Sequence, residues 1–367
     1  MRYDLTLSPD YVSSWSFKDA IREIFQNALD QQTLDPANEM TSSFAKQLDG
    51  TYTLQVQSRK STLDKSSLLL GHTTKESDSR TIGQFGEGYK LALLVLLRSN
   101  HKVTIHNYGA LETWTPAFAY SSKYNSTILS INVAKYRLKT VPNYNLIWII
   151  QGISQDDMRS WRDFNLVTNK NYEHIDLEGR QVLTEPRHVN HIYVSGLFVC
   201  VSSTPLSYGY NLWPEDVKLD RDRGMVDSFD LLWNLSMLWA KYPTVSTVVK
   251  MVEQNANDVK YLDNNSYATP VRQDLTVNFI ATHGMSAVPV STQVQADALK
   301  HTGLTTIIVP ELVYKLINCN FSMAIARAKP SPLTLLQAFG EDHSACFTKQ
   351  AKDDFQRLLE ASKTWRN

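Results

Sequence analysis

The sequence has few cysteines, no net charge and no long apolar run, and each of these features excludes a class of protein. Its 367 residues include three cysteines, Cys200, Cys319 and Cys346, which lie far apart in the chain. This spacing supports neither a disulfide framework nor a zinc site, so we interpret them as buried or incidental thiols of a reducing compartment. The 37 Lys and Arg residues balance 37 Asp and Glu residues. The charge therefore gives no bulk argument for binding nucleic acid or an anionic membrane.

Hydrophobic segments are short. The longest apolar run, 91–97, falls far below the roughly 20 residues that cross a bilayer. The first seven residues lack the apolar core of a signal peptide. We therefore expect a soluble cytoplasmic protein without membrane contact, located in the host cytoplasm if the chain is viral.

The segment 19–30, DAIREIFQNALD, predicts a helix with polar side chains along one stripe. Glu23, Asn27 and Asp30 are spaced i, i+4 and i+7, which puts a carboxylate, a carboxamide and a second carboxylate on one side of a helix. The apolar Ile24 falls on another face, where it can pack against a core. An ordinary solvated helix face has the same pattern, so this helix alone does not decide the function.

A glycine-rich segment, TIGQFGEGYK, follows at 81–90 and leads directly into the apolar run. Glycines before a helix let the backbone approach an anion closely and leave N–H groups pointing at it. The segment lacks the Gly-Lys-Ser/Thr of the P-loop, and its G-x-x-G-x-G order differs from the dinucleotide fingerprint. A glycine cluster alone is weak evidence, but its combination with an E-x-x-x-N-x-x-D helix at this separation is a specific pattern.

Together the two motifs resemble the Bergerat-fold ATPases, the GHKL superfamily of gyrase, the ninety-kilodalton heat-shock chaperone, histidine kinases and MutL. Segment 22–30, REIFQNALD, is similar to their N box, and segment 82–88, IGQFGEG, is similar to their second glycine box, as worded in the chaperone. Segment 73–75, TTK, resembles the phosphate-side Thr/Ser-Lys of chaperone and MutL. The resemblance implies an α+β fold: a Bergerat-type α/β sandwich that binds ATP, a second α/β domain and a small C-terminal α/β module.

The resemblance also implies a role for each matching residue. Glu23 would polarise the attacking water, Asn27 would bind Mg²⁺, and Asp30 would support the helix or lie near the nucleotide. Nucleotide contacts are implied for Thr74, Lys75, Gly83, Gln84, Phe85, Gly86, Gly88 and Lys90. For the two lysines, the alternative is a solvent-exposed side chain. The implied reaction is slow hydrolysis of ATP to ADP and phosphate, coupled to closure of a lid over about 59–82 and to homodimerisation.

The adenine side departs most from the family pattern. In the family, the strand matching 51–57 leads into an Asp-x-Gly-x-Gly box whose aspartate binds the adenine amino group. Here Ser58 stands in place of the aspartate, and both glycines are absent. A hydroxyl can accept a hydrogen bond from an amine, with about half the strength of a carboxylate. The alternative partner for the adenine amino group is Asp64, at a neighbouring position.

We expect three domains: an ATP-binding domain over 1–166, a second domain over 167–265 and a C-terminal module over 266–367 that binds a partner or dimerises. The segment LDRDR at 219–223 resembles the loop that sends a basic residue to the γ-phosphate in chaperone and MutL. Either Arg221 or Arg223 would neutralise charge on the transferring phosphoryl group. The alternative is a set of surface ion pairs between neighbouring Asp and Arg side chains.

Three classes of function follow. The first is an ATP-driven, chaperone-like or MutL-like conformational machine that acts on a macromolecular client, expected to be a protein. The second is a degenerate module that senses or holds nucleotide with little or no hydrolysis. The third is a DNA-repair factor or a host-interaction factor of a virus or mobile element, which salt-dependent DNA binding would distinguish from the other two.

Overall fold

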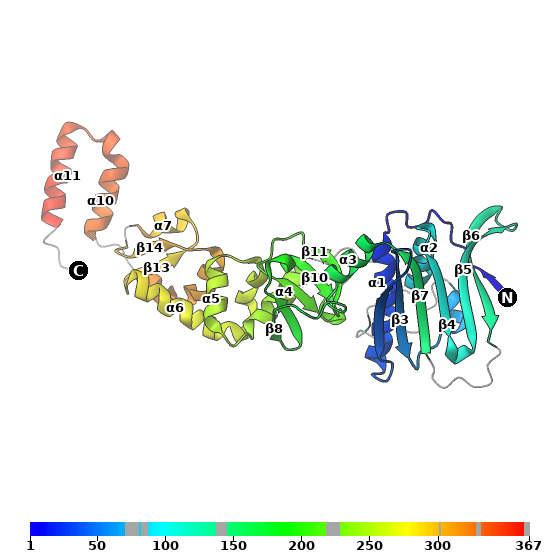
Figure 1. Ribbon diagram of the computed structural model, residues 1–367. Helices are drawn as coiled ribbons and strands as arrows, with labels where there is room; N and C mark the ends of the chain where they lie inside the picture. The colour runs from blue at the N-terminus through cyan, green and yellow to red at the C-terminus, as the bar shows by residue number, and fades with distance from the viewer. Residues whose placement is uncertain are drawn as a thin grey trace. The chain divides into compact units, whose positions relative to one another are not determined.

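The computed structural model describes residues 1–69, 81, 87–136, 145–217, 228–300, 302–327 and 332–362. The chain divides into two compact units, Met1–Asp230 and Leu231–Asn367 (Figure 1). The predicted boundary near residue 166 lies inside the first unit, between its two sheets, and the one near 265 lies inside the second unit. No helix in the described part of the chain has the length and apolar content needed to cross a membrane.

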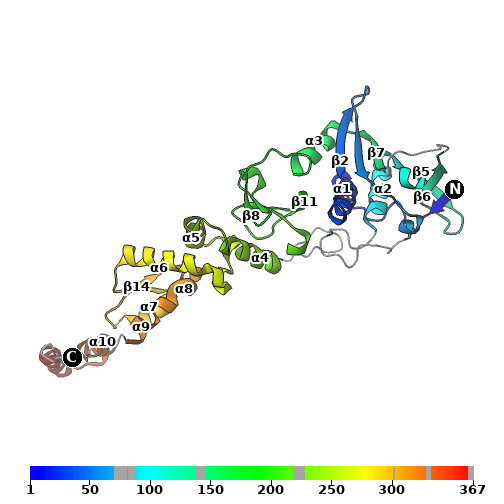
Figure 2. The same ribbon diagram turned by 90° about the horizontal axis from the view of Figure 1, so that it is seen from below.

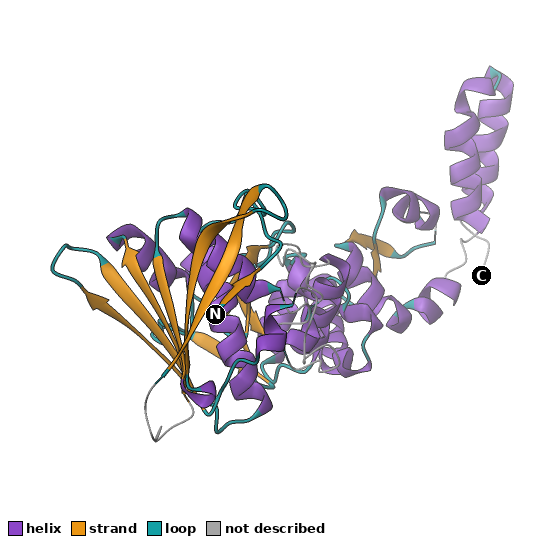
Figure 3. Cartoon of the chain, turned by 90° about the vertical axis from the view of Figure 1, so that its right-hand side faces the viewer, coloured by secondary structure: helices purple, strands orange, loops and turns teal. Residues whose placement is uncertain are grey.

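The first unit is built on a seven-stranded sheet whose neighbouring strands are all antiparallel, in the order β1-β6-β5-β4-β7-β3-β2. The strands fan out in one twisted layer (Figure 3). Their bounds are β1 Arg2–Asp4, β2 Met40–Lys46, β3 Tyr52–Arg59, β4 Lys102–Asn107, β5 Glu112–Ser121, β6 Ser126–Lys135 and β7 Asn145–Ile153.

Sequence periodicity predicted β1, β3, β4, β6 and β7 but not the two strands with a weaker pattern. The polar sequence of 35–50 predicts a connection or a short helix, yet this stretch contains β2, a polar edge strand paired with β3. Four strands rather than the expected three follow the glycine-rich segment, because β5 contains a proline and no clean alternation. Pairing with β3 and β6 stabilises these two segments as strands.

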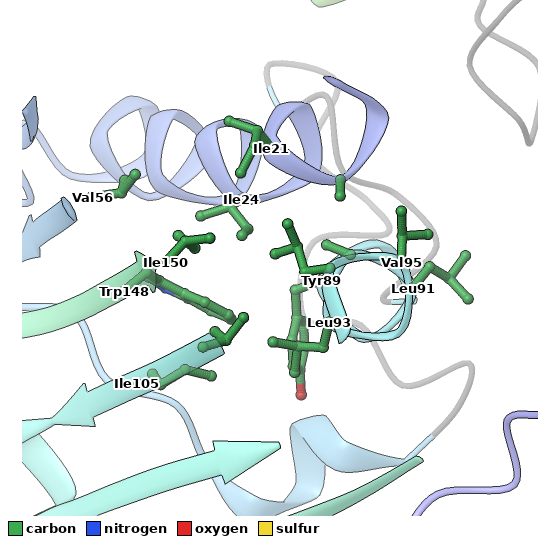
Figure 4. Packing of buried hydrophobic residues seen from close by; sticks show 14 of the residues in the cluster. Ile21, Ile24, Val56, Tyr89, Leu91, Leu93, Val95, Ile105, Trp148 and Ile150 are labelled. Atoms are coloured by element: carbon green, nitrogen blue, oxygen red, sulfur yellow. The ribbon is translucent and has the colours of Figure 1, made fainter. Parts of the chain in front are cut away.

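Three helices belong to this part of the unit: α1 Phe17–Leu34, α2 Gly88–Arg98 and α3 Gln155–Phe164. Ser16 and Asp19 form a capping box at the start of α1, with the Ser16 amide donating to the Asp19 carboxylate at 2.8 Å. Helices α1 and α2 pack side by side on one face of the sheet (Figures 2 and 4). Ile21 and Ile24 of α1 converge there with Tyr89 and Leu93 of α2, over Val56, Ile105, Trp148 and Ile150 of the strands.

A second, mixed sheet of five strands completes the unit, in the order β11-β10-β12-β9-β8. Its strands are β8 His174–Leu177, β9 Arg180–Leu183, β10 His191–Val194, β11 Leu197–Val201 and β12 Gly209–Leu212. The segment 191–201 was expected to be one strand, but it is a hairpin, because Ser195 and Gly196 both adopt positive φ and reverse the chain. The segment 207–211, expected to be a turn, contains most of β12.

The second unit is mainly helical, with a two-stranded parallel sheet of β13 Ala287–Val290 and β14 Thr305–Ile308. Its helices are α4 Ser228–Ala240, which crosses the boundary between the units, α5 Val245–Glu253, α6 Thr269–His283, α7 Gln293–Leu299, α8 Glu311–Ile317, α9 Ser322–Arg327, α10 Pro332–His343 and α11 Lys349–Ser362. The sequence of 275–280 predicts a strand, and this prediction is wrong: these residues belong to α6, which buries Val271, Leu275 and Phe279 at i, i+4 and i+8. The chain is therefore α+β, with mainly antiparallel sheets and helices.

Two histidines at the second sheet, the buried His188 just before β10 and the half-buried His191 at its start, make the stability of the first unit depend on pH. His188 is 2% exposed, and its Nδ1 lies 2.8 Å from the Tyr193 hydroxyl. Gly209 is required beside it, because a Cβ there would lie 2.2 Å from the His188 carbonyl oxygen. Burial lowers the pKa of His188, and the nearby Arg187 charge lowers it further; burial also lowers the pKa of His191.

We predict that the free energy of unfolding falls as the pH drops below about 6.5, because these histidines then bind protons in the unfolded chain but stay neutral in the folded one. The slope is at most about 1.4 kcal/mol per pH unit for each histidine. Urea denaturation of the full chain between pH 7.5 and 5 measures it, and His188→Gln should reduce the slope by one histidine's share. An unchanged slope in this variant would contradict the assignment.

Candidate functional site

Helix α1 carries its polar stripe into the interior of the unit. Glu23 and Asp30 are each 1% exposed, while Asn27 between them is half-buried. The solvated-face alternative for this stripe is therefore wrong. Carboxylates are rarely buried, because removing their charge from water costs several kcal/mol unless partners compensate. A single helix that buries two of them marks this face of α1 as a candidate site.

Arg22 lies close to Glu23, although sequence analysis gave it no role. Its Nε is 3.8 Å from Glu23 Oε1, and its Nη1 is 3.6 Å from Asp19 Oδ1. The Arg22 side chain is only 11% exposed, so water screens this pair weakly. Its position within the N-box motif, directly before Glu23, could have indicated Arg22.

The carboxamide of Asn27 is oriented by its own helix. Its Nδ2 donates a hydrogen bond to the Glu23 carbonyl oxygen at 2.9 Å, one turn earlier. This bond occupies the amide nitrogen and leaves the carboxamide oxygen as the acceptor on the same side chain. A neutral amide oxygen is a hard ligand of the kind that Mg²⁺ prefers.

Ser58 and Asp64, the two candidates for contact with the adenine base, differ in burial. Ser58 near the end of β3 is 2% exposed and alternates with the buried Leu54 and Val56, so it lies on the face that the helices cover. Asp64 is exposed and precedes the short 3₁₀ helix η1 (Lys65–Leu68), where its carbonyl oxygen accepts from the Ser67 amide at 2.9 Å.

The segment after β3 is fastened to the sheet by Asn107, the last residue of β4. Asn107 is fully buried; its Oδ1 accepts from the Thr62 hydroxyl at 2.9 Å and the Leu63 amide at 3.3 Å, and its Nδ2 donates to the Leu63 carbonyl at 2.8 Å. Lys65 adds an ion pair of 2.7 Å with Glu112. Burial raises the pKa of Glu112, but the hydrogen bonds from Lys65 and Trp114 outweigh it and hold this pKa below its usual value.

Helix α2 begins at Gly88, the last glycine of the glycine-rich segment. Lys90 in its first turn is fully buried, so the expectation of an exposed lysine is wrong there. Its ammonium donates to the main-chain carbonyl of Leu69. Burial lowers the pKa of Lys90 to about 8, against an opposing contribution from Glu87. A contact between Lys90 and phosphate stays a prediction.

Several predicted site residues lie outside the described part of the chain: Thr74, Lys75, Gly83, Gln84, Phe85, Gly86, Arg221 and Arg223, together with most of the predicted lid. Thr81, at the start of the glycine-rich segment, is described and fully buried. Within the described residues, no three His, Cys, Asp or Glu side chains gather as a metal-binding group. Cys319 and Cys346 are exposed rather than buried, and Cys200 is half-buried.

No protein-family model matches this chain. An uncharacterized protein of Mycoplasma pneumoniae is 24% identical over 228 residues, which cover 60% of this chain and 88% of that protein. A likeness at this level assigns neither a family nor a function. The resemblance to Bergerat-fold ATPases therefore depends on the motif residues themselves.

We predict that Asn107→Ala lowers the free energy of unfolding by about 2 kcal/mol, because it removes three hydrogen bonds of a buried side chain, two of them to the main chain of Leu63. Urea denaturation measures the change. Thr62→Val is the matched control: it removes only the bond from an exposed hydroxyl and should cost about 0.5 kcal/mol. Equal losses in the two variants would show that Asn107 does not anchor this segment.

Proposed function

We propose that the first unit binds ATP and Mg²⁺ in a Bergerat-type site and hydrolyses ATP slowly to ADP and phosphate. Turnover would drive lid closure and dimerisation of the chain on a macromolecular client. The observation that carries this proposal is the burial of both carboxylates of the N-box stripe, Glu23 and Asp30, on a helix packed directly against α2. An incidental match to the motif would have left these charges in water, where they cost nothing.

The residues present fit a bound magnesium nucleotide. The Asn27 carboxamide is held by its bond to the Glu23 carbonyl, with its oxygen left as an acceptor. Helix α2 begins at Gly88, so its first N–H groups and the positive end of its dipole favour a phosphate group. Asn27 would hold Mg²⁺, which supplies positive charge to the β- and γ-phosphates when bound.

Glu23 is the residue that we assign to the chemical step. Its carboxylate would orient the attacking water and accept a proton from it as the new bond to phosphorus forms. Arg22, with its Nε 3.8 Å from Glu23 Oε1, would hold the carboxylate in position. The positive charge that either Arg221 or Arg223 would bring to the γ-phosphate stays part of the proposal.

One observation favours a second candidate, a nucleotide sensor with little or no hydrolysis. Ser58 is buried on the face that the helices cover, where relatives in the resembled family carry an aspartate. A neutral hydroxyl would bind the adenine amino group more weakly than a carboxylate. A weakly held nucleotide suits a module that reports nucleotide concentration.

We predict that Glu23→Gln keeps ATP affinity within about threefold of the wild type but slows phosphate release by about 10²–10⁴-fold, the usual loss when a general base is removed. Calorimetry with Mg²⁺ and a phosphate-release assay measure the two quantities. Thr33→Ala, at an exposed position near the end of the same helix, is the control that should change neither. Wild-type turnover in Glu23→Gln would remove Glu23 from the mechanism.

The same two assays separate the candidate functions. Binding with Glu23-dependent release supports the ATPase. Binding without release supports the sensor. If the wild-type chain binds no nucleotide at all, both candidates are wrong.

We predict that Asn27→Ala lowers the affinity for ATP on the order of tenfold in the presence of Mg²⁺ and removes the difference between titrations with Mg²⁺ and with a chelator. Asn27→Asp retains a hard oxygen and should preserve most of the Mg²⁺ dependence. A variant Asn27→Ala that still responds to Mg²⁺ like the wild type would eliminate Asn27 as the metal ligand.

A further inference from the structure

The start of α2 holds the end of η1 through two consecutive side chains. The Tyr89 hydroxyl donates to the Ser67 carbonyl oxygen at 2.7 Å and lies 3.0 Å from the Ser67 hydroxyl. The next residue, Lys90, donates from its ammonium to the Leu69 carbonyl. The main chain on either side of Leu68 is thus bonded to α2 immediately after Gly88. We call this group of four residues (Ser67, Leu69, Tyr89 and Lys90) the α2 junction.

Both side chains of α2 in this junction are buried. Lys90 is fully buried and Tyr89 is 7% exposed, with the Tyr89 ring meeting Trp148 of β7 edge-on. The ammonium of Lys90 also lies 5.6 Å from the centre of the Tyr89 ring. Burial raises the pKa of the Tyr89 hydroxyl, against the opposing hydrogen bond with Ser67, so the hydroxyl keeps its proton and remains a donor.

We propose that Lys90 is a positioning residue, which fixes the segment after the adenine-side strand β3 to the first turn of α2, and not a ligand of phosphate. Lys90 and Tyr89 donate to two carbonyl oxygens of this segment, so moving the ammonium to a phosphate would break the bond to Leu69 and loosen the attachment of the segment to α2. The segment 62–69 is already fastened to β4 and β5 through Asn107 and Glu112. Lys90 adds the connection to the helix that follows the glycines.

This inference depends on the proposed function for its consequence, because the junction would join the base side of a nucleotide site to its phosphate side. Removing the Lys90 side chain should then lower the affinities for adenosine and for ATP by the same factor, because both ligands need the segment after β3 in place. If Lys90 were a phosphate ligand, its removal would instead lower the affinity for ATP and leave the affinity for adenosine unchanged. The two roles therefore predict different ligand series.

The first test needs no nucleotide. Hydrogen exchange of the full chain should become about tenfold faster at the Ser67 and Leu69 amides in Lys90→Met, because this end of η1 opens more often. Lys90→Arg retains a charged donor and should recover part of the protection, and Tyr89→Phe should raise exchange at the same amides. Lys102→Met, an exposed lysine at the start of β4, is the control and should leave these amides unchanged.

The second test titrates adenosine and ATP into wild type, Lys90→Met and Lys90→Arg. Equal losses of affinity for adenosine and ATP in Lys90→Met, with recovery in Lys90→Arg, support the positioning role. A loss confined to ATP overturns it in favour of a phosphate ligand, and unchanged exchange at Ser67 and Leu69 overturns the junction itself. If the wild type binds neither ligand, the proposed function fails, while the exchange result still decides whether Lys90 holds the segment.

Discussion

The packing of α1 against α2 on one face of the seven-stranded sheet is the constraint on which the candidate site depends. Ile21 and Ile24 of α1 meet the sheet and α2 in one apolar cluster, so α1 is covered from more than one side. A helix covered in this way buries polar residues that would face water on a free helix. Glu23 and Asp30 are inside because their apolar neighbours fix the rotation of the helix.

Burial of charge at this end of the unit is compensated by close partners. Glu23 has Arg22 at 3.8 Å, Glu112 has Lys65 at 2.7 Å, and the Lys90 ammonium has the Leu69 carbonyl. Each charge would be costly alone, and removal of one partner leaves the other buried without compensation. Charges of this kind are retained where they give a defined geometry, which is what a nucleotide site requires.

The segment that follows β3 connects Glu112 with Lys90. Ser58 lies near the end of β3, on the face that the helices cover. The residues after β3 are bonded to β4 by the hydrogen bonds of Asn107 and to β5 by the ion pair of Glu112. The hydrogen bonds of the α2 junction attach the same segment to α2. The base side and the phosphate side of the proposed site would therefore move together.

The sequence by itself determined helix α1, several strands of the first sheet and the candidate residues. The spacing of Glu23, Asn27 and Asp30 predicted one stripe of α1, and alternation predicted strands such as β3 and β4, because these patterns are local properties of the chain. It did not determine that segment 275–280 continues a helix or that residues of 35–50 form a strand, because local preference there is weak. Pairing and packing decide such segments.

Burial was likewise decided only in the tertiary structure. A row of polar residues on α1 is compatible with either a solvated or a buried helix face, and only the folded structure shows Glu23 and Asp30 at 1% exposure. The sequence named Lys90 but could not show that its ammonium bonds to Leu69, because those residues are 21 positions apart and meet only when η1 folds onto α2. Exposure and long-range partners depend on how distant segments pack, which local pattern does not contain.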